Sequence, residues 1–487
     1  MGDQLQFIQL EAMVVALGLA IQLADLFLSE SARRSLGWVA AGALGLVFWL
    51  SFRGSYVALA DGEAFAGIYR LDGLALFFKR FFLLVAIFVL VFAVDFASRL
   101  KGGVSEYLAF ILFALSGMMF ASSANDFSLL FVSIELITVT FYILVSFQRH
   151  RMHSLEAGVK YLILGAVSSS FLVYGIALVF GEAGSLKFDV IREAHAGLLG
   201  SNVFLFGMLF VFAGLAFKIS AFPFQIWAPD VYQGAPAPTT TFLAVGSKAA
   251  GFVLLIRLFG SVVPELTAQW TSMLMVVAAL TILYGNLCAL PQRNLKRLLA
   301  YSGIANAGYL LMGIVAQSRE GTVAILYYLA GYLFTLVAAF MIINLLTREG
   351  EGEDISCLAG LNKRSPFLAL ALTLCAVSLA GIPPLAGFFG KFLLVKSVAA
   401  KAFGDVGYFA LLAVAVFGVV VSIYYYFGII RTIYWSKDTP DNSPVAIAWP
   451  TRIVLGLCVA AILYLGLLPN KPINWANAAA KIETVAK

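Results

Sequence analysis

Four ionisable residues lie inside otherwise apolar runs of this chain, and together they indicate a chemistry. They are Glu135 in Phe127–Phe147, Lys218 in Val203–Phe222, Lys248 in Thr241–Val263 and Lys391 in Phe367–Val398. An ionised group at the depth of a lipid bilayer costs roughly 2.5–3.5 kcal/mol on insertion scales. A chain that keeps one acid and three lysines in such runs is expected to use them to move charge.

The composition places those runs in a membrane. The 487 residues are 62% hydrophobic and only 12% charged, with a mean hydropathy of +0.95. A soluble protein of this length could not bury so much apolar surface in one core. Apolar stretches of about 20 residues, each long enough to span a bilayer as a helix, recur along the whole chain. We therefore predict an all-α, polytopic membrane protein.

About fourteen transmembrane helices are expected, an even number that places both termini on one side. The spans are Phe7–Leu28, Leu36–Phe52, Leu74–Val94, Tyr107–Ser123, Phe127–Phe147, Val159–Phe180, Val203–Phe222, Thr241–Val263, Trp270–Leu290, Leu298–Ala316, Thr322–Leu346, the broken span Phe367–Val398, Val406–Ile430 and Ile453–Leu468. The first is read as a retained span, because no basic residues precede it and no small-residue cleavage site follows.

Basic residues cluster in alternate loops and predict the orientation. The clusters are Arg33/Arg34, Arg99/Lys101, Arg149/Arg151, Arg293/Lys296/Arg297, Arg348/Lys363/Arg364 and Arg431/Lys437. The positive-inside rule makes these loops cytoplasmic and places both termini outside. The net charge of +6 is then explained by topology and by contact with anionic membrane lipids, and nucleic-acid binding is not expected.

Two spans are interrupted by proline, and each carries a lysine beside the interruption. Lys218 precedes Pro223, and Lys391 follows Pro383-Pro384. Broken helices are tolerated at membrane depth where they line an enclosed cavity. The broken spans are five apart, which predicts two inverted five-helix repeats, as in ion-coupled transporters. The expected segments are an N-terminal three-helix segment at 1–104, repeats at 105–265 and 266–433, and a C-terminal helix at 434–487.

Each charged position also has an ordinary explanation. A protonated Glu135 could be hydrogen-bonded to a neighbouring hydroxyl. Lys248 and Lys391 could extend their ammonium groups to the membrane surface, whereas Lys218 is too deep in its span for this. For Lys160, which begins the sixth span, position alone favours neither reading.

Other polar residues are given no chemistry. Asp230 is interpreted as a helix-cap or loop acid, and Tyr424-Tyr425-Tyr426 as lipid-facing or interfacial packing. The four cysteines form no CxxC pair, the three histidines fall in expected loops, and no glycine-rich nucleotide motif is present. Iron–sulfur, zinc, haem and nucleotide sites are therefore disfavoured. We expect this chain to bind no cofactor.

Four motifs carry a family resemblance over nearly the whole chain. They are FKISAFPFQIWAPDVYQGAPAP at 217–238, Leu155–Tyr161, Arg293–Ser302 and Leu379–Lys391. These stretches resemble the signature of the N-subunit family of proton-pumping NADH–quinone oxidoreductase, respiratory complex I. The resemblance implies an antiporter-like subunit of the membrane arm in a bacterial inner membrane. In such a membrane the termini, which the charge pattern places outside, would be periplasmic. NADH, FMN, iron–sulfur clusters and quinone would belong to other subunits of the membrane and peripheral arms, which are the implied partners.

The resemblance also assigns roles by motif match. Glu135 would face the charge of a neighbouring subunit, and Lys218 would be its partner on the broken helix. Lys160 and Lys248 would form a central relay leading to Lys391 on the second broken helix. This chain departs from the family at two points, where Gln225 and Asn306 replace histidines that often occur there. Neither replacement titrates near neutral pH, so proton transfer at these points would need water.

Two other functions remain open at this stage. The first alternative is an Mrp-type cation/proton antiporter subunit without redox coupling, which sodium-dependent transport would favour. The second is a structural membrane scaffold whose charges only lock helices together. In that case, replacing the lysines would lower assembly but not pumping per assembled complex.

Overall fold

The computed structural model describes residues 2–100, 102–347, 353–436 and 443–480, and within them the chain is almost entirely helical. The expected loop residues Lys101, Arg348 and Lys437 lie outside the described residues. The chain divides into two compact units, which we call unit 1 and unit 2. Unit 1 comprises residues 1–220, 234–271 and 478–487, and unit 2 comprises residues 221–233 and 272–477.

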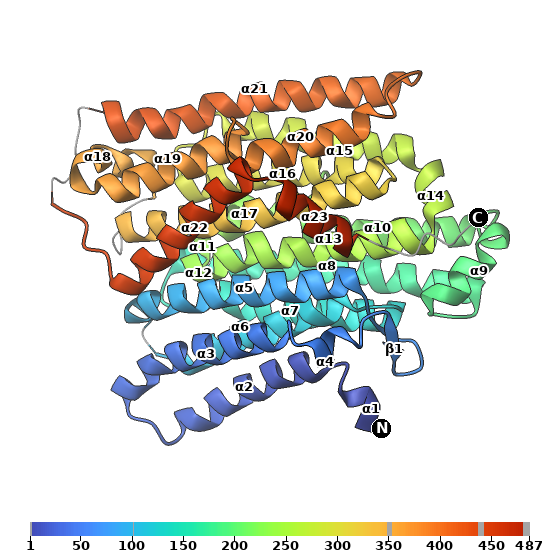
Figure 1. Ribbon diagram of the computed structural model, residues 1–487, viewed down its shortest axis with the longest axis horizontal. Helices are drawn as coiled ribbons and strands as arrows, with labels where there is room; N and C mark the ends of the chain where they lie inside the picture. Colours follow the sequence, from blue (N-terminus) through green and yellow to red (C-terminus); the bar gives the residue numbers. More distant parts are fainter. Residues whose placement is uncertain (1, 101, 348–352, 437–442, 481–487) are drawn as a thin grey trace. The chain divides into compact units, whose positions relative to one another are not determined.

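Unit 1 contains the N-terminal half of the helices and a short β-hairpin (Figure 1). Its helices are α1 (Gly2–Leu5), α2 (Gln9–Asp25), α3 (Glu30–Leu50), α4 (Gly54–Val57), α5 (Gly73–Phe96), α6 (Val104–Ser122), α7 (Phe127–Val145), α8 (Met152–Ala183), α9 (Phe188–Leu198), α10 (Asn202–Ile219), α12 (Ala237–Phe242), α13 (Lys248–Arg257) and α14 (Pro264–Gln269). Strands β1 (Gly62–Ala64) and β2 (Tyr69–Leu71) pair antiparallel between α4 and α5.

Unit 2 contains most of the remaining helices (Figure 1). They are α11 (Trp227–Gly234), α15 (Thr271–Ala289), α16 (Leu295–Val315), α17 (Arg319–Leu346), α18 (Leu361–Arg364), α19 (Pro366–Ala380), α20 (Ala386–Ala399), α21 (Val406–Trp435), α22 (Trp449–Leu467) and α23 (Asn470–Ala479). Helix starts follow ordinary capping chemistry in both units: the Asp126 carboxylate accepts from the Leu129 amide at 2.7 Å, and the Asn294 side chain from the Arg297 amide at 3.0 Å.

Each of the fourteen expected spans coincides with one of these helices or with consecutive helical segments. Among the described residues, eleven helices are long and apolar enough to cross a membrane. The other three expected spans are α2, which has 17 residues, the apolar part of α3, Ser35–Leu50, and the interrupted pair α19 and α20. The prediction of an all-α polytopic membrane protein is confirmed. The division into two inverted repeats between flanking segments stays a prediction.

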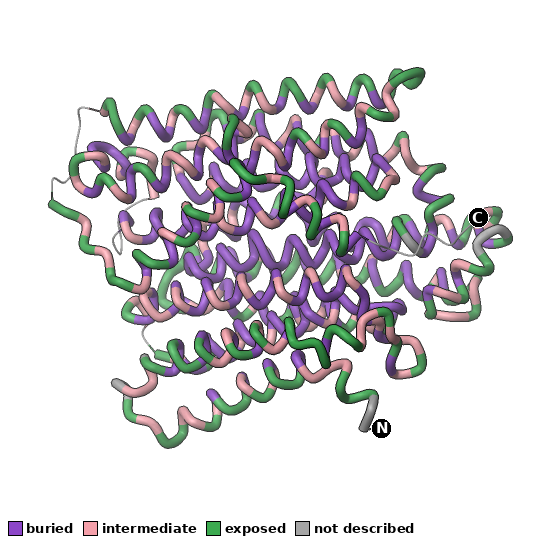
Figure 2. The backbone as a smooth tube through the Cα atoms, viewed as in Figure 1, coloured by how far each residue is buried: buried purple, intermediate pink, exposed green. Residues whose placement is uncertain are grey.

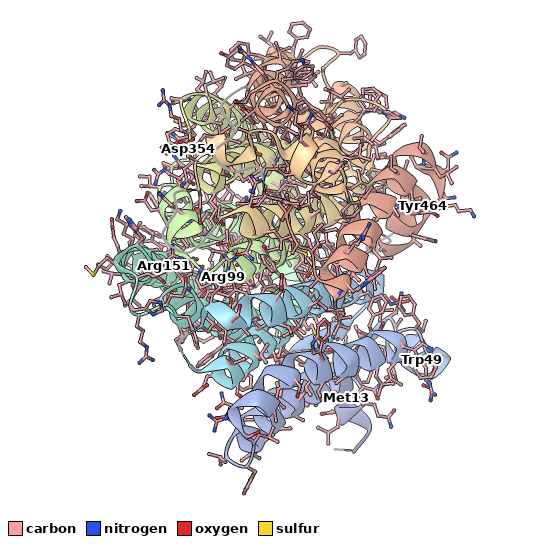
Figure 3. All side chains as sticks on the ribbon, turned by 90° about the vertical axis from the view of Figure 1, so that its left-hand side faces the viewer. Met13, Trp49, Arg99, Arg151, Asp354 and Tyr464 are labelled. Atoms are coloured by element: carbon pink, nitrogen blue, oxygen red, sulfur yellow. The ribbon has the colours of Figure 1, made fainter. Side chains whose placement is uncertain are left out.

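The outer helices expose apolar side chains, as a membrane protein requires. Figure 2 shows exposed positions along α21, where Val416, Val420 and Tyr424 are more than half exposed. In unit 1, Met13 of α2 and Trp49 of α3, both labelled in Figure 3, are 41% and 53% exposed. These faces are available to lipid or to neighbouring membrane subunits.

Basic residues gather at one end of unit 1. Arg33 at the start of α3 pairs with Asp25 at the end of α2 at 3.0 Å. Arg99 follows α5 and Arg151 precedes α8, and Figure 3 labels both on the end that faces the viewer. These arginines therefore lie at the same end of unit 1, as expected for basic residues in alternate loops.

Both proline-containing spans are broken, as expected. Helix α10 ends at Ile219, and Ser220 takes the left-handed conformation with φ 61°. Helix α19 ends at Ala380, and Gly381 follows with φ 84°. A left-handed residue after the last turn is a common helix ending, and proline cannot continue the ladder of hydrogen bonds beyond it.

The eighth span differs from the continuous helix that its apolar run predicts. Two π-helical segments, Leu243–Ser247 and Leu258–Val262, interrupt it on either side of α13. The ten residues of α13 between them are all buried (Figure 2). Single-turn π segments in helices occur frequently at functional sites. Lys248 is the first residue of α13 and Arg257 the last.

Close contact across the second break predicts a strong effect of one added methyl group. A Cβ at Gly387 would lie 1.8 Å from the Ser378 carbonyl oxygen. The Gly387→Ala change should therefore force α19 and α20 apart and destabilise the protein by ~1–3 kcal/mol. The detergent-extracted complex should then have a lower melting temperature. Gly428→Ala is the matched control, because a Cβ there would have no neighbour within 4 Å. Equal melting temperatures for the two variants would contradict this packing.

Candidate functional site

Lys218 is buried in unit 1 and hydrogen-bonded to the helix that carries Glu135. Its side chain lies in the last turn of α10 and is 3% exposed. The ammonium Nζ donates to the Thr138 hydroxyl at 2.8 Å, and that hydroxyl donates to the Ile134 carbonyl at 2.6 Å. Thr138 is three residues after Glu135, so both lie on one face of α7. The hydroxyl therefore links Lys218 to the Glu135 helix.

Glu135 is half-buried, and its partner is a hydroxyl group. The Ser169 hydroxyl on α8 donates to the Glu135 carboxylate. None of the ion pairs within the described residues joins Glu135 to Lys218. The expected pair is thus separated, with the Thr138 hydroxyl as the group in contact with the lysine. The hydrogen bond that the ordinary explanation of Glu135 requires is present, and it is compatible with either protonation state of the carboxyl group.

Lys248 is fully enclosed in unit 1, and its helix packs against Lys218. It is 2% exposed, so it does not extend to a membrane surface. One turn after it, Gly251 allows close approach: a Cβ there would lie 3.6 Å from both Cβ and Cγ of Lys218 and 2.6 Å from the Ile219 side chain. The stem of Lys218 therefore lies against the helix that begins with Lys248.

Lys160 is placed differently from the other lysines. It lies two turns into α8, which begins earlier than the sixth span predicted, and it pairs with Glu156 at 2.7 Å. Its side chain is 42% exposed. The structure therefore brings Lys218 and Lys248 together in the interior of unit 1 and leaves Lys160 partly exposed, so its relay role stays a prediction.

Lys391 lies at the second break, in unit 2. It is 4% exposed and extends back from α20 to the end of α19, where Nζ donates to the Leu379 carbonyl at 2.8 Å. Its ammonium also lies 4.9 Å from the centre of the Tyr309 ring. This burial contradicts a snorkelling lysine.

The two broken spans thus share one electrostatic arrangement. Each lysine lies beside the end of the first half-helix: Lys218 belongs to the last turn of α10 and donates to Thr138, and the Lys391 ammonium lies against the last carbonyls of α19. Free carbonyl groups and the helix dipole make that end negative. The α19 end therefore stabilises the Lys391 ammonium, and the Thr138 hydroxyl stabilises that of Lys218, in each case without a carboxylate in contact.

A hydrogen-bonded network of tyrosine, asparagine and serine lies beside Lys391 in unit 2. Its members are Asn286, Ser302, Asn306, Tyr309, Tyr328, Tyr425 and Tyr426, from α15, α16, α17 and α21. Tyr328 donates to Asn306 Oδ1 at 2.8 Å, and Asn306 donates to the Ser302 hydroxyl at 3.4 Å. Ser302 is bonded in turn to the Tyr426 hydroxyl. Asn306 therefore accepts one hydrogen bond of the network and donates another. Its amide cannot bind an extra proton near neutral pH.

The tyrosine network corrects one interpretation of the sequence. Tyr425 and Tyr426 are 5% and 1% exposed, whereas Tyr424 is 72% exposed. The reading of all three as lipid-facing or interfacial is wrong for the two that point inward. Tyr425 donates to Asn286 Oδ1 at 3.1 Å. A run of three identical residues has no periodicity that could have separated them, since successive helix positions point in different directions.

Two further positions near the first break belong to unit 2. Gln225 is 2% exposed, and its Oε1 accepts no hydrogen bond from the described residues. Asp230 lies in the first turn of α11, as an acid near a helix start was expected to do, and it pairs with Arg297 at 2.6 Å. That ion pair is partly exposed and is expected to stabilise the fold by only ~0–1 kcal/mol.

Sequence reasoning missed three more buried acidic or basic residues inside the spans. Glu11 in α2, Lys79 in α5 and Arg257 in α13 are 0%, 0% and 6% exposed. The signal was available for Lys79 and Arg257, because both interrupt apolar runs. Glu11 likewise lies inside the expected span Phe7–Leu28, near the start of α2.

Comparison with known proteins identifies the family to which the chain belongs. The family model described as "NADH:quinone oxidoreductase/Mrp antiporter, TM" matches residues 124–422. The NADH-quinone oxidoreductase subunit N of Moorella thermoacetica is 37% identical over 472 residues, which is 97% of each chain. The chain belongs to the NADH-quinone oxidoreductase subunit N family. The expectation from the motifs is confirmed, and members of this family are proton-translocating subunits of the membrane arm.

Solved structures agree with membership of the subunit N family. A chain of respiratory complex I from Thermus thermophilus with bound aureothin superposes with a TM-score of 0.79 and 30% identity, covering 96% of this chain and 99% of that one. A chain of the Mrp complex from Dietzia sp. DQ12-45-1b superposes with a TM-score of 0.81 at 19% identity, over 97% of each chain. The second likeness concerns the fold alone. Within the described residues, no group of three or more His, Cys, Asp or Glu could hold a metal ion.

Proposed function

We propose that this chain translocates protons through Glu135, Lys218, Lys248 and Lys391 within an NADH-quinone oxidoreductase. Quinone reduction elsewhere in the complex would change the charge that Glu135 meets. The altered charge would change the proton affinity of Lys218 and then of Lys248 in unit 1, and Lys391 would respond in unit 2. Lys160 would exchange protons with this route from its partly exposed position. Like charges along a series of lysines lower one another's proton affinity, so the arrival of one proton favours the departure of another.

The burial of Lys218 at a broken helix end is the single observation that carries this proposal. An ammonium enclosed by apolar residues is unstable unless something offsets its desolvation. Here the Thr138 hydroxyl does so, and it can still accept a hydrogen bond from the neutral amine when the charge is lost. A change of charge on α7 can therefore shift the protonation of Lys218 without breaking an ion pair.

The partners proposed for the chain are the other subunits of the enzyme. FMN, iron–sulfur clusters, NADH and quinone are assigned to those subunits, and membrane lipid surrounds the exposed helices. Mild-detergent extraction of native membranes should co-purify the chain with FMN and iron–sulfur subunits. Migration with antiporter subunits only, together with sodium-dependent transport, would instead favour an Mrp-type function.

We further propose that both termini lie on the periplasmic side of the inner membrane. Clustered arginines at one end of unit 1 support this, since basic loops stay in the cytoplasm. A cysteine introduced at Phe65, in the β1–β2 turn, should react with a membrane-impermeant thiol reagent in intact spheroplasts, and one at His150 should not. The reverse labelling pattern would contradict the orientation.

The tyrosine–asparagine network predicts a role for one hydroxyl. Tyr426→Phe removes the group bonded to Ser302 and keeps the buried ring. Pumping per assembled complex should fall several-fold, by roughly 1 kcal/mol of lost hydrogen bonding. Tyr424→Phe is the matched control on the exposed face of α21. If both variants pump at the unchanged rate, the network contributes only to packing and has no part in proton translocation.

A further inference from the structure

A second group of buried titratable side chains lies at the start of α2 and α5, away from the relay lysines. The Lys79 ammonium is hydrogen-bonded to Glu11 Oε1 and to the Tyr69 hydroxyl. The same ammonium lies 4.8 Å from the centre of the Tyr69 ring. All three side chains are at most 1% exposed. We call Glu11, Tyr69 and Lys79 the N-terminal triad.

In the triad, some hydrogen-bond acceptors receive no hydrogen from a donor. The Tyr69 hydroxyl faces two acceptors, the Phe7 carbonyl at 2.9 Å and Glu11 Oε1 at 3.0 Å. A phenol has one hydrogen and can serve only one of them at a time. Glu11 Oε2 is buried and has no hydrogen-bond partner among the described residues. A buried carboxylate oxygen without a donor is unfavourable, and the triad therefore has a place for one more proton.

Charged and titratable groups of β2, α4, α5 and α13 interact with the triad. From α4, the Tyr56 hydroxyl points to the Phe7 carbonyl at 3.4 Å and interacts with Glu11 and Arg80. Lys79 also interacts electrostatically with Asp72 and Arg257. Arg70 lies 3.9 Å from the Asp72 carboxylate. Burial raises the pKa of Tyr69, as does the Glu11 charge, so the phenol stays protonated at neutral pH.

A paired arginine connects the triad to the helix of Lys248. The Arg257 guanidinium donates to both oxygens of Asp72, at 3.0 and 2.8 Å, and to the Ser122 carbonyl at 2.7 Å. Burial raises the pKa of the Asp72 carboxyl, but Arg257, the Ala75 amide and Arg70 together lower it by more, so the pKa is held below its usual range. The Arg257–Asp72 ion pair therefore persists at neutral pH. Lys248 lies at the other end of α13, about 13 Å away at the rise of an α-helix.

We infer that the N-terminal triad is a second proton-binding site of this subunit, with Glu11 as the group that takes the proton. On uptake, an O–H bond forms at Glu11 Oε2 and the carboxylate becomes a neutral acid. Lys79 stays an ammonium, and the Tyr69 hydrogen is directed to the Phe7 carbonyl. Release reverses these steps, and no electrons are transferred. Loss of positive charge at Lys248 favours uptake, and its return favours release.

The inference rests on the proposed relay and can fail separately from it. The test measures protons pumped per NADH oxidised, and its dependence on pH, with the purified complex in liposomes. Glu11→Gln should lower this ratio in assembled complex. Tyr69→Phe, which keeps the ion pair, should shift the pH midpoint of pumping by about one unit. Glu63→Gln, in the exposed part of β1, is the control and should change neither.

Each outcome separates a proton site from a structural lock. If Glu11→Gln does not assemble, Glu11→Asp and Tyr69→Phe carry the test through their pH profiles. An unchanged ratio and pH profile in every assembled triad variant would overturn the inference, because a lock affects only assembly. If Lys218→Ala abolishes pumping and the triad variants do not, this inference fails while the proposed function stands. If neither does, the proposed function fails as well.

Discussion

Lys218→Ala is expected to lower proton pumping and the coupled quinone reductase activity by at least about tenfold in the assembled complex. The change removes the buried ammonium that the last turn of α10 carries and that donates to Thr138. Alanine at this site cannot accept or release a proton, so the signal from Glu135 would stop there. Pumping is measured in inverted membrane vesicles as a pH gradient driven by NADH, normalised to the amount of assembled complex.

Two further variants define what Lys218 contributes. Lys396→Ala removes an exposed lysine of α20 and should leave pumping unchanged. Thr138→Val keeps the ammonium but removes its hydrogen-bond acceptor, and should reduce pumping less than Lys218→Ala does. If Lys218→Ala pumps as well as Lys396→Ala, the buried charge has no part in translocation.

Glu135→Ala is expected to have the second-largest effect, again a loss of about tenfold in pumping. The carboxylate is the one acid in the candidate relay, and its half-buried position leaves it available to a neighbouring subunit. Glu135→Gln separates its charge from its hydrogen bond, because the amide oxygen can still accept from Ser169. Glu135→Gln should therefore be nearly as impaired as Glu135→Ala in the NADH-driven vesicle assay.

The ordinary reading of Glu135 makes a different prediction. If Glu135 serves only to accept a hydrogen bond from Ser169, then Ser169→Ala should lower pumping as much as Glu135→Ala does. Glu135→Gln should then pump at close to the normal rate. Lysine-to-methionine changes distinguish the scaffold alternative in the same way. A scaffold loses assembled complex and keeps pumping per complex, whereas a relay keeps assembly and loses pumping.

The membrane topology and the breaks could be predicted from sequence because they depend on local physics. Hydrocarbon thickness fixes the length of a span, and proline removes a backbone donor wherever it occurs. Lys218 was identifiable for the same reason, since its depth in the span excludes a surface position. The left-handed endings at Ser220 and Gly381 then follow from the need to terminate each helix before its proline.

Contacts between helices could not be predicted in this way. The Thr138 hydroxyl that meets Lys218 is 80 residues away in the chain. The N-terminal triad joins residues up to 68 positions apart. Tyr425 and Tyr426 are buried because α21 packs that side against the other helices of unit 2. Such pairings are set by tertiary packing, which a single sequence does not specify.

Proton stoichiometry tests the account most directly. Purified complexes carrying Lys218→Ala or Lys396→Ala would be placed in liposomes, and the protons pumped per NADH oxidised would be compared with those of the unchanged complex. A buried proton relay predicts that the ratio falls with Lys218→Ala and is unchanged with Lys396→Ala. The same ratio in all three complexes would contradict the assignment of proton translocation to the buried lysines of this chain.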